Sequence, residues 1–207
     1  MSTNTPKIKI CGLTRVQDIQ TANALQLDYI GFVFAPKSKR YVAPEQAKQL
    51  RQQLAPGIQA VGVFVNAPPE QVAALLADGT IDIAQLHGQE DAAYLNRLFS
   101  LTRAPIWQAF RIESAADISR ANASPADLIL LDHGAGGTGE SFDWNLLHGM
   151  ARPFILAGGL TPQNAAEAIA QAHPYAVDTS SGCETNGVKG PAKMQAFVNA
   201  VRNVKTD

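Results

Sequence analysis

Eight short apolar runs alternate with longer stretches of helical composition along this chain of 207 residues. Their starts lie roughly 20 to 30 residues apart, about the length of one βα unit. Several runs, such as Gly31-Phe32-Val33-Phe34, are apolar without clean alternation, which is typical of parallel strands buried on both faces. Eight βα units in one chain favour an α/β fold, a single closed (β/α)₈ TIM barrel with short loops, over an open sheet. The runs begin near Lys7, Tyr29, Ala60, Asp82, Ile106, Leu128, Phe154 and Tyr175.

The stretches between the runs carry signals of helix starts. Thr14 is a candidate N-cap, and prolines at 44 and 69 suit a first helical turn. The chain has no linker or low-complexity stretch, so we expect residues 1–207 to form one domain, with residues 1–6 as a flexible N-terminal tail. The expected helices are Gln17–Leu25, Pro44–Leu54, Pro69–Ala77, Gln163–Ala172 and Ala192–Val204, with shorter ones near Asp91–Leu98, Ala115–Ala121 and Trp144–Met150.

Composition limits the partners of the chain. It is 46% hydrophobic and 17% charged with a net charge of −1, so we expect no basic surface for nucleic acid. No apolar run approaches the ~20 residues that cross a bilayer, and residues 1–6 lack the parts of a signal peptide. The two cysteines, Cys11 and Cys183, fit neither a metal-ligand spacing nor a disulfide framework. These features predict a cytoplasmic protein without a membrane partner.

Reactive residue types close several of the runs. The first run ends in Cys11, the sixth ends in Asp132, the second is followed by Arg40, and the fourth ends near His87. The opposite ends are blander, as in Ala55-Pro56-Gly57. Enzymes on this fold have their sites at the C-terminal ends of the strands. A thiol and a carboxylate at that end could form an acid/base pair, so the pattern indicates an enzyme more than a binding module.

Each of these side chains also has an inert interpretation. A lone cysteine in an apolar strand is usually a small hydrophobic residue, and Asp132 could cap the next segment or join a salt bridge. Arg40 could be a solvated loop charge, and spacing does not say which basic residue within 37–40 faces a ligand. His87 and Arg111 are weaker candidates than the others.

A buried ion pair is expected near the first run. Lys9 lies two residues before Cys11 and therefore on the same strand face. If that face points into the barrel, the Lys9 ammonium is buried and needs a partner. Asp178, on the last strand beside the first, is the candidate partner. We regard Cys183 as incidental, although the same end of the barrel could bring it near Cys11.

Two loops suit a phosphate group. The loops after the seventh and eighth strands are the usual phosphate seat of such barrels, and here they carry Gly158-Gly159 and Ser180-Ser181-Gly182. Glycine lets backbone N–H groups approach an anion, and serine hydroxyls add donors. The alternative is that Gly158-Gly159 only makes a tight turn. The pair of neighbouring loops favours a phosphorylated small-molecule substrate.

Seven motifs in order resemble the phosphoribosylanthranilate isomerase family, the Amadori isomerases of tryptophan biosynthesis. The resemblance runs from about Lys7 to Val201, and the ordered set is highly specific although each motif alone is modest. The motifs are Lys9-Ile10-Cys11-Gly12-Leu13-Thr14, Gly31-Phe32-Val33-Phe34, Ser38-Lys39-Arg40-Tyr41, Gln85-Leu86-His87-Gly88, Gly136-Gly137-Thr138-Gly139 with Phe142-Asp143-Trp144, Ala157-Gly158-Gly159-Leu160, and Val177-Asp178-Thr179-Ser180-Ser181-Gly182.

This resemblance implies the isomerisation of N-(5′-phosphoribosyl)anthranilate to 1-(2-carboxyphenylamino)-1-deoxyribulose 5-phosphate on a single (β/α)₈ barrel, with no metal or organic cofactor. By the same resemblance, Asp132 matches the general acid that opens the ribose ring and Cys11 the general base that takes the C2′ proton. Arg40 matches the residue that holds the anthranilate carboxylate, and His87 lines the site. The two phosphate loops match as described.

The chemistry of this pair makes a demand on pKa values. The reference values, ~3.9 for Asp and ~8.5 for Cys, are reversed relative to an acid and a base at neutral pH. The site must therefore raise the pKa of Asp132 by burial and lower that of Cys11 by cations or helix N-termini, or use minor protonation states.

Two positions depart from the family pattern. Gly190 stands where an aspartate is common before the last helix, and Cys183 stands where an apolar residue is usual. Both put the fine geometry of the phosphate loop in question rather than the activity.

Other activities remain open at this point. The histidine-pathway sugar-phosphate isomerase, or a dual-substrate relative, would keep an aspartate in place of Cys11, and residues 66–69 form no second phosphate loop. Indole-glycerol-phosphate synthase would need an extra N-terminal segment and a catalytic lysine. A non-catalytic sugar-phosphate-binding barrel would need neither Cys11 nor Asp132. For the oligomeric state, a monomer and a homodimer both remain open.

Overall fold

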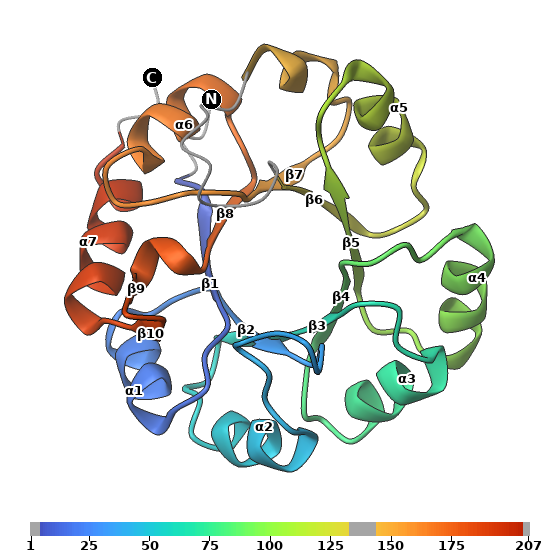
Figure 1. Cartoon of the computed structure of the whole chain (residues 1–207), viewed down its shortest axis with the longest axis horizontal. Coiled ribbons are helices and arrows are strands. Elements are labelled where there is room, and N and C mark those ends of the chain that lie inside the picture. The colour runs from blue at the N-terminus through green and yellow to red at the C-terminus, as the bar shows by residue number, and fades with distance from the viewer. Residues whose placement is uncertain (1–4, 133–143, 205–207) are drawn as a thin grey trace.

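A computed structural model shows a ring of eight parallel strands enclosed by a ring of helices (Figure 1). The structure describes residues 5–132 and 144–204. Neighbouring strands pair in chain order from β1 to β8, and β8 pairs with β1, so the barrel is closed. Closure leaves no open sheet edge in the barrel. This confirms the predicted single (β/α)₈ barrel of the α/β class with short loops.

The strands begin within one residue of where the apolar runs predict them. Each is short because the whole chain is near the lower size limit of such barrels, ~200 residues. The strands are β1 Lys7–Cys11, β2 Tyr29–Val33, β3 Gln59–Phe64, β4 Ile83–Leu86, β5 Ile106–Arg111, β6 Leu128–Asp132, β7 Phe154–Leu156 and β8 Ala176–Thr179.

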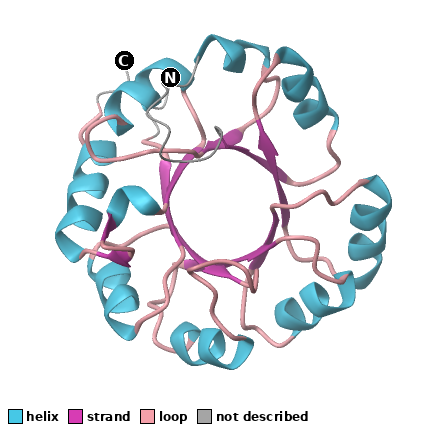
Figure 2. Cartoon of the chain, viewed as in Figure 1, coloured by secondary structure: helices cyan, strands magenta, loops and turns pink. Residues whose placement is uncertain are grey.

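Helices follow the strands and form the outer layer (Figure 2). The predicted helices are present, most of them with shifted ends, and the predicted N-cap Thr14 is wrong: the N-cap of α1 is Arg15, whose backbone N–H donates to Asp18 Oδ2 at 3.0 Å. After β6, the expected helix near 144–150 is a 3₁₀ helix, η1 Trp144–Gly149. The α-helices are α1 Val16–Ala24, α2 Pro44–Arg51, α3 Pro69–Ala77, α4 Ala92–Leu101, α5 Ala115–Ala123, α6 Ala165–Ala172 and α7 Pro191–Arg202.

Strand side chains divide between two apolar clusters, because successive residues point to opposite faces. The larger cluster, with residues such as Ile10, Phe32 and Leu131, packs between the strands and the helices. The smaller cluster fills the barrel interior and includes Tyr29, whose ring meets the ring of Trp107 edge-on at 5.0 Å. The cavity described below lies above this interior cluster, so the bottom of the barrel is a packed floor.

Aspartates join strands at the N-terminal end of the barrel. Asp28, Asp82 and Asp127 each precede an even-numbered strand, and each carboxylate accepts the backbone N–H of a residue at the start of the preceding strand, at 2.7 to 2.8 Å. The backbone N–H of each aspartate donates to the carbonyl of that same residue. These reciprocal bonds fix pairs of strands to one another at the rim opposite the cavity.

A small hairpin that the sequence analysis missed follows β8. After the 3₁₀ turn η2 Ser181–Cys183, strand β9 Glu184–Thr185 pairs antiparallel with β10 Val188–Lys189. The two loop residues, Asn186 and Gly187, both have positive φ angles, 52° and 77°. Asn-Gly is the preferred pair for such two-residue loops, so the signal was present in the sequence.

Within the part of the chain that the structure describes, no helix is both long and apolar enough to cross a membrane.

Candidate active site

A cavity of about 260 Å³ opens at the C-terminal end of the barrel. Larger depressions of about 520 and 570 Å³ occur elsewhere among the described residues, but neither brings a thiol and a carboxylate together. The cavity at the strand ends does, as the sequence predicts. Its lining includes Cys11, Arg40, His87, Asp132, Gly158, Gly159, Asp178, Ser180 and Ser181, together with Val33, Ser38, Val63, Gln85, Ala157, Leu160 and Thr179.

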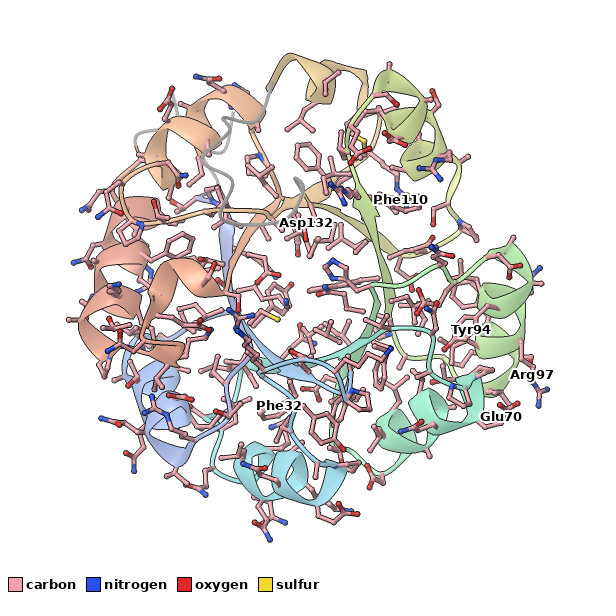
Figure 3. All side chains as sticks on the ribbon, in the orientation of Figure 1. Phe32, Glu70, Tyr94, Arg97, Phe110 and Asp132 are labelled. Atoms are coloured by element: carbon pink, nitrogen blue, oxygen red, sulfur yellow. The ribbon has the colours of Figure 1, made fainter. Side chains whose placement is uncertain are left out.

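The thiol of Cys11 is placed by its neighbour on the next strand. Cys11 ends β1 and pairs with Gly31 of β2, and a Cβ atom on Gly31 would lie 2.6 Å from Cys11 Sγ. Glycine at position 31 therefore leaves the room that the sulfur occupies. Asp132 ends β6 and reaches the same cavity from another part of the ring, with its side chain 28% exposed. Figure 3 shows Asp132 near the middle of the ring of strands.

His87 links Asp132 to a buried amide. His87 Nε2 lies 3.2 Å from Asp132 Oδ2, and Gln85 Nε2 lies 3.0 Å from His87 Nδ1. An amide nitrogen only donates hydrogen bonds, so in this orientation Nδ1 accepts and the ring proton is on Nε2. His87 then donates its Nε2–H to the Asp132 carboxylate. Gln85 is 1% exposed, so its side chain is held firmly behind His87.

The predicted ion pair under the cavity is present. Lys9 is fully buried, and its Nζ donates to Asp178 Oδ2 at 2.7 Å. Register explains the contact, because Lys9 of β1 and Asp178 of β8 are direct partners. Burial alone lowers the pKa of Lys9, but the charge of Asp178 and the hydrogen bond to it contribute most to an opposing shift, which raises that pKa above its usual value. Lys9 is therefore a cation. The other carboxylate oxygen of its partner, Asp178 Oδ1, is buried and has no hydrogen-bond partner among the described residues.

The pKa of Cys11 differs from the expectation. Burial raises the pKa of the Cys11 thiol, and the opposing attraction of the nearby Lys9 ammonium does not reverse that shift. Of the two expected alternatives, a Cys11 pKa lowered by cations is contradicted, and the use of a minor protonation state remains. The main physical reason is burial, which disfavours the charged thiolate, and Asp178 beside Lys9 adds to the shift by offsetting the charge of that ammonium.

Arg40 reaches the cavity rim with its charge already paired. Its Nε and Nη2 donate to the two carboxylate oxygens of Glu184 at 2.6 and 2.8 Å. Glu184 also accepts a hydrogen bond from Lys189 Nζ, and that ammonium donates to the carbonyl of Ser180 at 3.0 Å. The Ser180 hydroxyl in turn donates to the carbonyl of Cys11 at 2.9 Å. A chain of polar contacts thus runs from the loop after β2 to the loop after β8.

The two glycine- and serine-containing loops lie side by side. Gly158 and Gly159 both have positive φ angles, 85° and 65°, which side chains rarely adopt. A Cβ on Gly159 would meet no atom within 4 Å, so open space lies over that backbone. Thr179 Oγ1 donates to the carbonyl of Leu160 at 2.6 Å and joins the two loops. Gly182 does not line the cavity, because it packs beneath the Leu160 carbonyl.

Comparison with known proteins connects this geometry to a family. The family model described as N-(5′-phosphoribosyl)anthranilate (PRA) isomerase matches residues 8–200. The chain belongs to this family. The N-(5′-phosphoribosyl)anthranilate isomerase of Caldanaerobacter subterraneus subsp. tengcongensis is 44% identical over 204 residues, which cover 96% of this chain and 98% of that relative.

Solved structures of PRA isomerases have the same fold. The enzyme from Thermus thermophilus superposes with a TM-score of 0.86 at 36% identity, over 96% of this chain and 100% of that one. Another PRA isomerase, in complex with reduced 1-(o-carboxyphenylamino)-1-deoxyribulose 5-phosphate, superposes with a TM-score of 0.85 at 34% identity, over 95% of this chain and 98% of that one.

Some sequence predictions fall outside this PRA isomerase cavity or outside the described residues. Arg111 ends β5 but is exposed, and its Nε lies 2.7 Å from Glu113 Oε1. Cys183 is fully buried, with its Sγ 3.8 Å from the carbonyl of Lys193, and it does not line the cavity. The motif Gly136-Gly137-Thr138-Gly139 with Phe142-Asp143 lies outside the described residues.

Three residues around this PRA isomerase cavity were not predicted as site residues. Gln85 appeared only within a motif, and no local pattern marks it as a partner of His87. Glu184 and Lys189 belong to the hairpin β9–β10, which the Asn186-Gly187 pair could have revealed. Among the described residues, no group of three or more His, Cys, Asp and Glu side chains could hold a metal ion.

Proposed function

We propose that this chain catalyses the Amadori rearrangement of N-(5′-phosphoribosyl)anthranilate to 1-(2-carboxyphenylamino)-1-deoxyribulose 5-phosphate in tryptophan biosynthesis. The observation that carries the proposal is a cavity of about 260 Å³ with Cys11 and Asp132 at the ends of two strands of one closed barrel. Membership of the PRA isomerase family supports this substrate, and the cavity lining, which includes Cys11, Asp132 and the loops at 158–159 and 180–181, supports the chemistry.

Asp132 acts as the general acid in this proposal. Its protonated carboxyl gives the proton to the ribose ring oxygen, the bond from C1′ to that oxygen breaks, and the nitrogen lone pair forms a Schiff base. The remaining carboxylate then accepts the Nε2–H of His87, 3.2 Å away. A hydrogen bond to the charged form stabilises the conjugate base, so His87 favours the proton transfer out of Asp132.

Cys11 acts as the general base. Its thiolate takes the proton from C2′, the Schiff base becomes an enolamine, and that species tautomerises to the ketone. The raised pKa of Cys11 leaves a minor thiolate population in the free protein, which makes each thiolate a stronger base. The protonated Schiff base is itself a cation in the cavity and favours the thiolate beside it.

The remaining site residues bind the substrate. Gly158, Gly159, Ser180 and Ser181 offer donors to the phosphate, with Ser180 contributing its backbone N–H because its hydroxyl donates to Cys11, and Gly182, which lacks a Cβ, lets the two loops pack closely. Asp178 lines the cavity beside its ion pair with Lys9 and contacts the ribose there, and Arg40 binds the anthranilate carboxylate. His87 completes the wall of the cavity beside Asp132.

The domain organisation, cellular location and oligomeric state are part of the same proposal. Residues 1–207 act as one TIM-barrel domain in the cytoplasm, on a small phosphorylated substrate, as a monomer or a homodimer. Sedimentation velocity at two protein concentrations would separate the two oligomeric states.

The test is turnover of freshly prepared phosphoribosylanthranilate, followed as the loss of its fluorescence, by the wild type and Asp132→Asn. We expect rapid decay with the wild type and a decrease of about 10²- to 10⁴-fold in kcat/KM with the variant. Thermal unfolding of the variant should match the wild type, because the Asp132 side chain is partly exposed. No decay above background with the wild type would overturn the proposal and make the histidine-pathway substrate the next to assay.

A further inference from the structure

Arg40 has more hydrogen-bond donors than Glu184 uses. A guanidinium carries five N–H groups in a fixed planar fork. Glu184 takes one from Nε and one from Nη2, at 2.6 and 2.8 Å. Among the described residues, the edge formed by Nη1 and the second N–H of Nη2 has no partner, and it suits another planar acceptor. Since Arg40 lines the cavity with about a third of its side chain exposed, that edge is available to a ligand.

We propose that Glu184 is the positioning residue for recognition of the aromatic carboxylate: it holds the Nε/Nη2 edge of Arg40 so that the adjacent Nη1/Nη2 edge binds the carboxylate of the anthranilate ring. This inference rests on the proposed function, because it assigns a partner to Arg40 within that same site. Glu184 itself does not line the cavity and acts only through Arg40.

The hairpin β9–β10 sets the position of Glu184. The Asn186-Gly187 loop places Lys189 directly opposite Glu184, and Lys189 is 4% exposed. Burial by itself raises the pKa of Glu184, but hydrogen bonds from Arg40 and Lys189 lower that pKa below its usual value. The carboxylate is therefore charged when it meets Arg40.

The aliphatic part of the Arg40 side chain is held in place, as its guanidinium is. Gly12 has a φ of 80°, and a Cβ atom there would lie 3.2 Å from Arg40 Cβ and Cγ and closer still to Cδ. The aliphatic part of Arg40 therefore lies flat on the backbone of Gly12, the residue after Cys11. The backbone N–H of Arg40 donates to Ser38 Oγ at 3.1 Å. Among the described residues, the ionic contact with Glu184 fixes the rotation of the guanidinium plane.

A second pair in the same chain provides a matched control. Arg97 donates twice to Glu70 Oε1, at 3.0 and 2.8 Å, between helices α4 and α3. Both side chains are more than half exposed, and Figure 3 shows them on the outer ring, away from Asp132. This is also an Arg–Glu ion pair, but Arg97 does not line the cavity at the strand ends.

The experiment compares wild type, Glu184→Gln and Glu70→Gln by calorimetric binding of two compounds. One is reduced 1-(o-carboxyphenylamino)-1-deoxyribulose 5-phosphate, and the other is the same compound without its aromatic carboxyl group. In Glu184→Gln, we expect the Kd of the first to rise about 10- to 100-fold while the Kd of the second changes less than about twofold. Glu70→Gln should leave both unchanged. In turnover, KM should rise in Glu184→Gln with kcat nearly constant.

Each other outcome contradicts the proposal. Equal weakening of both compounds would show that Glu184 only supports the phosphate loop through Lys189 and Ser180, and no weakening would show that Arg40 needs no partner. If Glu184→Gln does not fold, Glu184→Asp keeps the charge opposite Lys189 but is too short to grip both nitrogens, and it should show the same selective loss. Failure of the proposed function would appear separately, as a wild type that binds the compounds but does not convert phosphoribosylanthranilate.

Discussion

Aspartates occupy both ends of this barrel, and they do different work at each. At the N-terminal end, Asp28, Asp82 and Asp127 each have a carboxylate oxygen bonded to a backbone N–H of the neighbouring strand. At the C-terminal end, Asp132 and Asp178 face the cavity, and one oxygen of Asp178 has no partner among the described residues. The same side chain fixes strands at one end and lines the cavity at the other.

The difference follows from what surrounds each carboxylate. Backbone N–H donors at the start of a strand have fixed positions, so an aspartate there accepts a backbone hydrogen bond that stabilises the fold. At the ends where the chain leaves the strands, loops carry polar groups around an open cavity, and a carboxylate there meets side chains such as His87 and Lys9. Chemistry at one end and stability at the other is the general division in this fold.

Replacement of the base at the reactive end should have the largest effect. Cys11→Ser should lower kcat/KM by about 10²- to 10⁴-fold, because a hydroxyl is far less readily deprotonated than a thiol. Unfolding in urea should change little. Retention of most activity would show that Cys11 is a packing residue, as its lone position in an apolar strand allowed.

The titration of Cys11 gives a second test of its role as the base. Because its pKa is raised, the thiolate fraction is small at pH 7 and increases as the pH rises toward and beyond the usual value of ~8.5. Alkylation by iodoacetamide, mapped by peptide mass, should therefore accelerate up to pH 9 or above at Cys11. Fully buried Cys183 should stay unmodified and serves as the internal control. Alkylation of Cys11 that reaches its full rate below pH 8 would contradict the raised pKa.

Asp178 combines the two roles, because it belongs to a buried ion pair and also lines the cavity. Asp178→Asn removes one partner of a buried ion pair and leaves the Lys9 ammonium without a countercharge. We expect a loss of about 3 to 5 kcal/mol in the free energy of unfolding, together with weaker substrate binding. The double variant Lys9→Met/Asp178→Asn should recover part of the stability but not the activity. Unchanged stability in Asp178→Asn would show that the pair contributes little.

The smallest effect is expected at the opposite rim. Asp28→Ala removes the acceptor of the Ile8 backbone N–H, 2.8 Å away, and should cost about 1 to 2 kcal/mol of stability. Turnover should stay within about twofold of the wild type, measured at a temperature where both are folded. Asp28→Asn keeps an acceptor oxygen and should lose less. A decrease in kcat comparable to that of Asp132→Asn would contradict the conclusion that the N-terminal end of the barrel contributes to stability and not to catalysis.

Much of the site could be predicted from residues that end apolar runs. Cys11, Asp132 and the loops at 158–159 and 180–181 were predicted from position on the strands, because the fold sends every strand end to one rim. The pairing of Lys9 with Asp178 also followed, since β1 and β8 must be neighbours in a closed barrel. Gln85 behind His87 and Glu184 behind Arg40 could not be predicted, because each contact depends on side-chain direction rather than on spacing.

The sequence by itself determined the fold, the family and the end of the barrel where the chemistry lies. The apolar runs and the helix start signals are short-range information. They define the strands and helices, and in a (β/α)₈ barrel those strands pair in chain order. The tertiary structure alone decided the direction of the Cys11 pKa shift, the polar chain from Arg40 to Ser180, and the close approach of Gly182 to the Leu160 carbonyl. Those properties depend on distances between residues far apart in the chain, and electrostatic and packing energies are set by such distances.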